Sequence, residues 1–311
     1  KKSIKKFKKL GVETITSDLK FKINNLRSPN LSKLKYIQAQ GLVKKTIKSF
    51  CPDLIHAHYA SSYGLLAYLS RFRPYIVSAW GSDIYDFPKK NFINRFLLKL
   101  VLCSANEVCS TSVAMSKEIK NLFKNIDVNI IPFGIDSNIF VPNKTPNKKF
   151  VVGTIKSIEK HNGIDCIVEA ARNIIYKYKK EIDFLIVGSG SLEKKMKEKV
   201  KKYNLNNNFK FTGFIPHENV KEYYHKLSIF IAVSTRESFG VSILEAAGCE
   251  IPSITSNVGG LNEVNINNET GIIINADDPH QLAESIVKLY EKDSLRKKFG
   301  FNARKNVIEN F

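Results

Sequence analysis

The most informative part of the sequence is Ser234-Thr235-Arg236-Glu237-Ser238-Phe239-Gly240-Val241-Ser242-Ile243-Leu244-Glu245-Ala246. It follows the apolar segment Ile229–Val233, a predicted strand, and opens a predicted helix. Gly240 allows the backbone to come close to a ligand, and the amides of Phe239, Gly240 and Val241 would point out of the helix N-terminus. Such amides attract a phosphate group. The stretch therefore predicts an anion-binding loop between a strand and a helix.

Two glutamates flank this loop. Glu237 comes before the predicted helix and can reach the hydroxyl groups of a bound ligand. Glu245 lies about two turns inside the helix, where a carboxylate can accept hydrogen bonds from a diol such as ribose. The alternative is that both are surface glutamates on either side of a core helix.

Outward from this stretch, short β-like runs alternate with helical segments, which predicts parallel sheets covered by helices. In the first half we expect strands at Val12–Thr16, Leu54–His58, Ile76–Trp80, Glu107–Ser110 and Val128–Pro132, and helices at Leu31–Phe50 and Asn91–Cys103.

The second half repeats the alternation. The expected strands are Phe150–Thr154, Phe184–Val187, Phe209–Thr212, Ile229–Val233, Pro252–Thr255 and Gly271–Ile274. The expected helices are Ile164–Tyr178, Leu192–Tyr203, Val220–Leu227, Val241–Gly248, Gln281–Glu291 and Ser294–Ile308.

Between the two halves lies Pro142-Asn143-Lys144-Thr145-Pro146-Asn147, whose composition is typical of a linker. The chain is thus predicted to be an α/β protein with two Rossmann-like, doubly wound domains, residues 1–142 and 143–311. A ligand cleft is expected between them at the carboxyl ends of the strands. Because the chain opens with a helix ending at Gly11, we expect the first strand of the first domain to be missing, and the last part of the second to be truncated.

Composition indicates the cellular compartment in which the protein works. No apolar run approaches the ~18 residues of a membrane-spanning helix. Because the N-terminal lysine cluster has no apolar stretch behind it, we expect no signal peptide. Five cysteines without a Cys-x-x-Cys pair argue against a disulfide framework or a zinc site, and favour a reducing cytosol. We therefore expect a cytoplasmic protein.

The formal charge of +20 attracts polyanions, or else reflects a lysine-rich, solvated surface. Within Lys1–Leu10 three apolar residues share one stripe of a basic helix, which fits an anionic membrane surface as well as an ordinary edge helix. A peripheral position at the inner face of the cytoplasmic membrane is thus an expectation. Because the charge is dispersed and no nucleic-acid module is recognisable, no nucleic-acid partner is predicted.

Two histidines lie at the end of an expected strand of the first domain, in Asp53-Leu54-Ile55-His56-Ala57-His58-Tyr59. His56 and His58 share one face of that strand, whose carboxyl end faces the cleft. A metal site would need a third ligand at suitable spacing, and none is evident, so no metal is predicted. His58, the nearer to the strand end, is the preferred contact to donor or acceptor. The alternative is that both histidines are simply hydrogen-bonded at a strand end.

The spacing of Glu237 and Glu245 resembles the Glu-x7-Glu signature of glycosyltransferase family four, a retaining, nucleotide-sugar-dependent family of GT-B fold. Further segments occur in the order of that family: Ile131–Asp136, Val152–Thr154 with Glu159-Lys160, Ile186–Gly190, Phe211–Phe214 and Val258–Glu263. The resemblance covers residues 150–311 and, more loosely, the first half.

The resemblance implies roles for individual residues. Glu245 would hold the ribose of the donor and Glu237 the transferred sugar, while the backbone at Phe214 would lie beside the base. Lys160 would neutralise the departing diphosphate, so that with the helix N-terminus no metal or other cofactor is needed. Glu237, Lys160 and His58 are thus the expected catalytic residues. The other expected donor-binding positions are Gly153, Thr154, Lys156, Gly188, Ser238, Phe239, Gly240 and Val241.

Two departures from the family pattern stand out. Thr154 occupies the place of the usual arginine after the glycine of the first strand, and Lys156 is offered as the replacement cation. In Ser78-Ala79-Trp80-Gly81-Ser82-Asp83, Trp80 stands where the family has a histidine that meets the sugar. An aromatic face can still pack on a sugar ring, so Trp80, Gly81, Asp83 and His56 are expected on the sugar or acceptor side.

The sequence predicts a retaining, metal-independent glycosyltransferase. It would move a sugar from a nucleoside diphosphate sugar to a glycan or lipid-linked acceptor, in the synthesis of cell-surface glycan or lipopolysaccharide. One alternative is a GT-B nucleotide-sugar epimerase, which would need acidic residues over C2 of the sugar. The other is an inactive basic scaffold or binding protein.

Overall fold

The computed structural model describes residues 34–143, 145 and 149–311. The expected Lys1–Leu10 helix and the strand Val12–Thr16 lie outside these residues. The chain divides into two compact units. The first reaches to Cys109 and includes Ile119–Asn129, and the second comprises Ser110–Glu118 and Ile130–Phe311.

The first unit is built on a sheet with the strand order β1-β2-β3-β4. Tyr75, at the start of β2, is fully buried and its hydroxyl donates to the Val101 carbonyl at 2.8 Å. Gly64 brings α3 so close to α5 that a Cβ there would lie 2.9 Å from the Val101 side chain. The strands of this sheet are β1 (Ile55–His58), β2 (Tyr75–Ala79), β3 (Glu107–Ser110) and β4 (Asn129–Ile130), and the helices of the unit are α2 (Leu34–Phe50), α3 (Tyr63–Ser70), α4 (Ser82–Tyr85) and α5 (Phe92–Ser104). The next helix, α6 (Val113–Leu122), is divided between the two units after Glu118.

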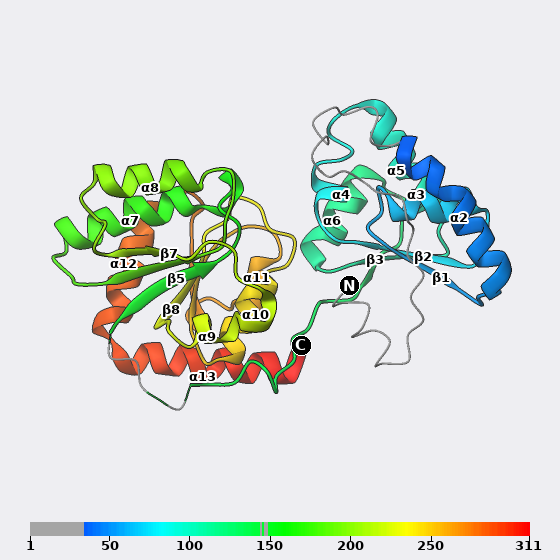
Figure 1. Cartoon of the computed structure of the whole chain (residues 1–311). Coiled ribbons are helices and arrows are strands. Elements are labelled where there is room, and N and C mark those ends of the chain that lie inside the picture. The colour runs from blue at the N-terminus through cyan, green and yellow to red at the C-terminus, as the bar shows by residue number, and fades with distance from the viewer. Residues whose placement is uncertain (1–33, 144, 146–148) are drawn as a thin grey trace. The chain divides into compact units, whose positions relative to one another are not determined.

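The second unit contains a six-stranded parallel sheet with the order β10-β9-β8-β5-β6-β7 (Figure 1). Its strands are β5 (Val151–Ile155), β6 (Asp183–Val187), β7 (Phe209–Phe211), β8 (Ile229–Ala232), β9 (Ser253–Ser256) and β10 (Gly271–Ile274). Its helical elements are η2 (Lys160–Asn162), α7 (Ile164–Tyr176), α8 (Glu193–Lys202), η3 (His217–Asn219), α9 (Lys221–Tyr224), α10 (Val241–Gly248), α11 (Leu261–Val264), α12 (Pro279–Glu291) and α13 (Asp293–Asn310).

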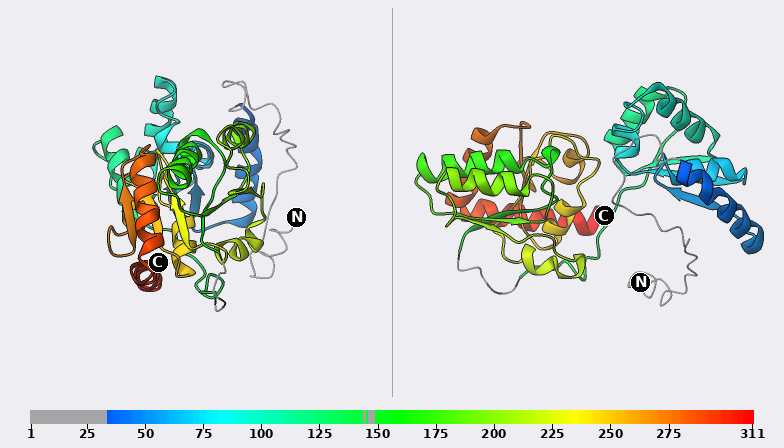
Figure 2. Two further views of the ribbon diagram at one scale, coloured as in Figure 1. Left: turned by 90° about the vertical axis from the view of Figure 1, so that its left-hand side faces the viewer. Right: turned by 45° about the horizontal axis from the view of Figure 1, so that its top comes forward.

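Helices cover both faces of this sheet, because successive strand residues point to opposite sides. In β6, Phe184 and Ile186 belong to the core under α7, α8 and α12. Leu185 and Val187 belong to the core on the other side, with α10 and part of α13. The two helix layers can be followed in Figure 1 and in the turned views of Figure 2.

The order of strands creates a switch point beside β5. The chain enters the sheet at β5, proceeds to β6 and β7 on one side, and returns to β8 on the other side of β5. The connections after β5 and β8 therefore leave in opposite directions, and in open α/β sheets the crevice at such a point is where ligands bind.

Most expected elements occur within two residues of their predicted bounds. The helix expected at Val220–Leu227 is shorter, because α9 ends at Tyr224. Four of the described α-helices, α3, α4, α6 and α11, were not predicted. Of these, α3 is apolar over most of its length and so has no clear amphipathic period, while α4 and α11 have only four residues each. Although the first domain was expected to end at residue 142, Phe140 is buried in the core of the second unit.

Among the helices that the structure describes, none combines the length and the apolar character needed to span a membrane.

Gly188 has a backbone φ of +135°, and a Cβ there would lie 2.0 Å from the Lys156 carbonyl oxygen. We therefore expect Gly188→Ala to force the loops after β5 and β6 apart and to lower the free energy of unfolding by about 1–3 kcal/mol. Urea denaturation followed by circular dichroism measures this. The matched control is Gly41→Ala, since Gly41 lies in α2 with no atom within 4 Å of an added Cβ, and alanine is the better helix former. Equal stability of Gly188→Ala and the parent chain would contradict the expectation.

Candidate functional site

The loops that follow the strands of the second sheet carry nearly all the predicted donor-binding residues. Lys156 and Lys160 follow β5, Gly188 follows β6 and Phe214 follows β7. Glu237 follows β8, just before α10. Because the strands are parallel, these loops meet at the same edge of the sheet.

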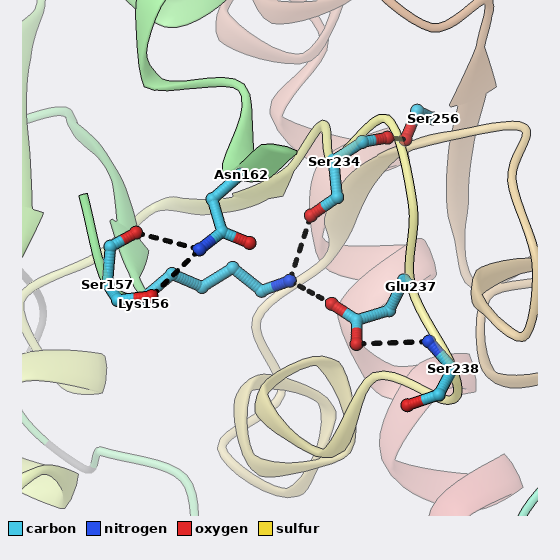
Figure 3. A network of polar contacts seen from close by, with 7 residues as sticks. All are labelled: Lys156, Ser157, Asn162, Ser234, Glu237, Ser238 and Ser256. Carbon is cyan, nitrogen blue, oxygen red and sulfur yellow. Dashed lines mark hydrogen bonds and ion pairs between the residues drawn. The ribbon is translucent and has the colours of Figure 1, made fainter. Parts of the chain in front are cut away.

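An ion pair joins the loops on the two sides of the switch point (Figure 3). The Lys156 ammonium contacts the Glu237 carboxylate and also donates to the Ser234 hydroxyl at 2.9 Å. The Lys156 side chain is 10% exposed and that of Glu237 21% exposed. A charge so far removed from water needs a partner, so each of these two residues requires the other when no ligand is bound.

The pair offers a cation and a carboxylate in one partly buried place. Glu237 is oriented further by the amide of Ser238, which donates to the same carboxylate at 3.2 Å. The hydroxyl of Ser256, at the end of β9, donates to the Ser234 carbonyl and so ties the β8 loop to the next strand. Such a site can receive an anionic group at Lys156 and hydroxyl groups at Glu237.

Lys160 is placed differently from Lys156. It opens the short helical turn η2, its side chain is exposed, and within the described ranges no ion pair or hydrogen bond engages its ammonium. The loop that carries both lysines is held by Asn162, whose amide donates to the carbonyl and hydroxyl oxygens of Ser157 at 2.8 and 2.9 Å. The role predicted for Lys160 at the diphosphate stays a prediction.

Close backbone approaches fix the loops around the pair. Gly188 packs on the Lys156 carbonyl, as described above. A Cβ on Gly259 would lie 2.0 Å from the Glu237 carbonyl oxygen, and the Gly260 amide donates to that oxygen at 3.3 Å. Gly259 has a φ of +49° and lies in the loop after β9. The connections after four of the six strands are therefore locked together around Lys156 and Glu237.

Two of the expected donor-binding residues serve the sheet itself. A Cβ on Gly153 would lie 2.6 Å from both the Leu185 carbonyl oxygen and the Leu227 side chain, so this glycine permits close packing of β5 on β6 and on the segment before β8. Thr154 is 1% exposed inside β5. Their positions place them beneath the site rather than on its surface.

The N-terminus of α10 adjoins Glu237. Gly240 is its N-cap residue with a φ of +111°, and no side chain caps this helix in the part of the chain described. The Phe239 ring is 2% exposed and lies against the rings of Phe133 and Phe311, with centroids 6.1 and 5.8 Å away. Phe239 can therefore offer a ligand only its backbone, as can Gly240, while Val241 is half-buried.

Glu245 lies buried in the second turn of α10, and both of its carboxylate oxygens have partners. The Tyr224 hydroxyl donates to one oxygen at 2.7 Å, and Nε2 of His217 lies 2.8 Å from the other. Burial, together with the charge of Glu245, raises the pKa of Tyr224 well above its usual value. Because each carboxylate oxygen has two lone pairs, Glu245 can still accept a ribose hydroxyl beside these bonds.

Sequence analysis missed both partners of Glu245. The side chain of His217 is 76% exposed and was not singled out from the sequence. Its position soon after β7, at the ligand-binding edge of a parallel sheet, was the signal that could have indicated it. Tyr224 lies in α9 and is fully buried; nothing in the residue pattern distinguished it from a core tyrosine.

Phe214 projects from the loop after β7 and is 76% exposed. The preceding Gly213 has a φ of +70°, and no atom lies within 4 Å of an added Cβ. An exposed aromatic ring beside open space can provide a platform for a planar base.

The first unit gathers three aromatic residues at the ends of β1 and β2. The ring centroids of His56 and His58 are 4.1 Å apart, and His58 meets Trp80 edge to face at 5.6 Å. His56 Nε2 also lies 2.8 Å from the Ser78 hydroxyl. Burial, and secondarily the charge of His58, lowers the pKa of His56. Among the described residues no group of three His, Cys, Asp or Glu side chains is placed to hold a metal.

Asp83 is fully buried, in contrast to the sugar-side contact expected of it. Its carboxylate accepts hydrogen bonds from the amides of Ala60 and Gly81, both at 2.7 Å, and from that of Trp80. Burial raises the pKa of Asp83 despite these bonds. Its carboxylate thus holds the turn that carries Trp80 and Gly81, and its influence on a ligand would act through those residues.

Comparison with solved structures defines the class of protein. The chain is similar to sucrose-phosphate synthase from Thermosynechococcus elongatus, with a TM-score of 0.78, 22% identity and coverage of 90% of this chain and 75% of that one. It is also similar to HepE of Anabaena, solved in complex with UDP, with a TM-score of 0.77, 20% identity and coverage of 88% and 78%. These likenesses show the GT-B fold.

Family models give the narrower assignment. The model described as glycosyl transferases group 1 matches residues 136–306, more than half of the chain, and that described as glycosyl transferase 4-like matches residues 8–112. The chain therefore belongs to the glycosyl transferases of group 1, which confirms the family and the fold class that the Glu237–Glu245 spacing predicted.

Curated relatives share about a quarter of their residues with the chain. An uncharacterized glycosyltransferase of Methanocaldococcus jannaschii is 27% identical over 283 residues, which is 89% of this chain and 77% of that protein. The 2-deoxystreptamine N-acetyl-D-glucosaminyltransferase of Niallia circulans is 27% identical over 76% of this chain and 61% of its own length. The N-acetyl-alpha-D-glucosaminyl L-malate synthase of Bacillus anthracis is 25% identical over 83% of this chain and 71% of its own. The chain thus spans between three fifths and four fifths of these relatives.

A double-mutant cycle tests whether Lys156 and Glu237 depend on each other. We expect Lys156→Met and Glu237→Gln to destabilise the fold singly, and the double variant to recover about 1–3 kcal/mol relative to their sum, because no unpaired charge then stays buried. Urea unfolding of the four chains gives the coupling energy.

The control is the cycle at Lys149 and Asp183, whose 3.1 Å pair has side chains 77% and 36% exposed. For Lys149 and Asp183 we expect a coupling energy of about 0.2–1 kcal/mol. Additive effects at Lys156 and Glu237 would show that the two residues are energetically independent.

Proposed function

We propose that the chain transfers a sugar from a nucleoside diphosphate sugar to an acceptor hydroxyl, with retention of anomeric configuration and without a metal ion. The observation that carries this proposal is the Lys156–Glu237 pair at the switch point, beside the uncapped N-terminus of α10. A cation and helix amides suit a diphosphate, and a carboxylate next to them suits a sugar hydroxyl.

The donor would lie along the carboxyl edge of the second sheet. Its base would lie at Phe214 and its ribose would bind Glu245, which His217 and Tyr224 hold in place. The diphosphate would meet the α10 amides and take Lys156 from Glu237, with Lys160 as a further cation. Glu237 would then be released to bind the transferred sugar. The donor itself would thus separate the ion pair.

The chemistry follows from where the negative charge develops. The acceptor oxygen attacks C1 of the sugar on the face that the diphosphate leaves, the bond between C1 and the phosphate oxygen breaks, and its electron pair stays on the diphosphate. The departing phosphate oxygen takes the proton of the acceptor hydroxyl. Lys156, Lys160 and the α10 amides would stabilise this departing charge, a kind of contribution that is often the largest in an active site.

The comparisons favour a uridine nucleotide as the first donor to examine. The HepE structures contain UDP or UDP-glucose, and two of the curated relatives are named for transfer of N-acetylglucosamine. We therefore propose a UDP-sugar, with UDP-N-acetylglucosamine and UDP-glucose as the leading candidates.

The acceptor is proposed to be a cell-surface glycan or its lipid-linked precursor, lipopolysaccharide included. Similarity to the capsular polysaccharide biosynthesis glycosyltransferase CapM of Staphylococcus aureus, 28% identical over 71% of this chain, supports this class. A lipid-linked acceptor would place the protein at the inner face of the membrane, where the basic Lys1–Leu10 segment would meet anionic headgroups.

Calorimetry against UDP, GDP, ADP and their common sugar conjugates tests the donor site. We expect one nucleotide to bind, and Glu245→Gln to weaken it by about tenfold or more while keeping an acceptor oxygen for Tyr224. The binding should not need a divalent cation and should survive EDTA. For the donor that binds, proton NMR of the product reports whether the anomeric configuration is retained.

The matched control is Glu198→Gln, on the exposed face of α8, which should leave nucleotide affinity unchanged. His217→Ala provides a second variant that removes a partner of Glu245 without altering the buried core. Failure of every nucleotide to bind a folded chain, or equal affinity in Glu245→Gln and Glu198→Gln, would contradict the proposed donor site.

A further inference from the structure

A second hollow opens at the carboxyl edge of the same sheet, away from the ion pair. It has a volume of about 260 Å³ and lies where β9 and β10 end and α12 begins. Five carboxamide side chains line it together with two isoleucines; the amides are those of Asn257, Asn262, Asn267, Asn275 and Gln281. All of them belong to the second unit.

Hydrogen bonds hold four of these side chains in place and occupy one end of each of the four amides. The oxygen of Asn267 accepts from the Ile273 amide at 2.9 Å, and that of Gln281 accepts from the Asn275 amide at 2.7 Å. The Asn262 amide donates to the oxygen of Asn257 at 2.6 Å. The side chains are therefore positioned by the loops themselves, before any ligand is bound.

The other ends of these amides keep their hydrogen-bonding capacity. In the described part of the chain, no partner engages the NH2 groups of Asn257, Asn267 and Gln281, or the side-chain oxygen of Asn262. Each NH2 group can donate and each oxygen can accept. The hollow thus presents both donors and an acceptor to a ligand.

The chemistry of the lining selects an uncharged, hydroxyl-rich ligand. No lysine, arginine, aspartate or glutamate lines the hollow, so it lacks the charge that a phosphate or carboxylate would require. Vicinal hydroxyls of a sugar ring both donate and accept, as the amides do. The Ile273 and Ile274 side chains add apolar surface for the CH groups of such a ring.

The hollow is linked to the candidate donor site through one short loop. Asn257 lies two residues before Gly259, which packs on the Glu237 carbonyl, and Asn262 follows shortly after Gly260. A ligand in the hollow would therefore contact the same loop that positions Glu237.

We propose that this hollow is a saccharide-binding subsite, specific for an uncharged sugar unit. That the hollow binds the glycan part of an acceptor rests on the function proposed above. That it binds a sugar at all does not depend on that function. The subsite would thus be a carbohydrate contact on the second unit that is separate from donor binding.

NMR of the 15N-labelled chain tests the proposal, because side-chain NH2 groups give their own signals. Maltose and N,N'-diacetylchitobiose are titrated with UDP present throughout, so that the candidate nucleotide site is filled. We expect saturable shifts at the five amides with at least one disaccharide.

Asn262→Trp, which fills the hollow and leaves the Asn267 and Gln281 bonds intact, should weaken the binding about tenfold or more. Asn206→Trp, on an exposed turn before β7, should not.

The outcomes separate this proposal from the function proposed above. UDP binding without any saturable sugar shift at these amides would overturn the subsite and leave the donor site standing. Sugar shifts that persist unchanged in Asn262→Trp would also overturn it. Sugar shifts at the amides with no effect of UDP anywhere would support the subsite and contradict the uridine donor. Circular dichroism confirms that each variant is folded.

Discussion

The candidate active site depends on one partly buried ion pair, that between Lys156 and Glu237. It forms because β5 and β8 are neighbours in the sheet although they are distant in sequence, so that the loops after these two strands lie side by side. These loops leave the sheet in opposite directions, and such a switch point is where a ligand-binding crevice forms. Neither charge has enough water around it to be stable alone. Glycines allow the neighbouring loops to pack directly on the backbone of both residues, so the pair is held from all sides of the switch point. A ligand that replaces one partner must therefore supply equivalent charge or hydrogen bonds, which a nucleoside diphosphate sugar can do at both ends.

Within the second unit, the remaining parts of the site are arranged outward from this pair. Glu245, in the second turn of α10, is buried and oriented by Tyr224 and His217 rather than by solvent. In the first unit, Asp83 serves in a similar way, since its carboxylate organises the turn that presents Trp80. In both places a buried acidic group determines the position of a neighbouring polar or aromatic group. Pre-organisation of this kind reduces the entropic cost of binding.

Much of this arrangement could be predicted from sequence, and the failures have physical causes. The spacing of Glu237 and Glu245 indicated the family and the fold because it occurs with further segments in the order of that family. The strands were found because parallel, two-sided strands are almost continuously apolar. The pairing of Lys156 with Glu237 could not be predicted, since these residues are distant in sequence and meet only through the strand order. Tyr224 and His217 escaped notice for the same reason, and Asp83 was expected near the ligand because burial cannot be seen in a short polar motif.

The most direct test of the account is a crystal structure of the chain with UDP-N-acetylglucosamine or UDP-glucose, whichever binds. We expect a diphosphate beside the Phe239–Val241 amides, with the Lys156 ammonium moved from the Glu237 carboxylate to a phosphate oxygen. Glu245 should meet the ribose, and Glu237 the sugar. A nucleotide bound at another edge of the sheet, or one bound with the Lys156–Glu237 pair intact and remote from it, would contradict the central claim.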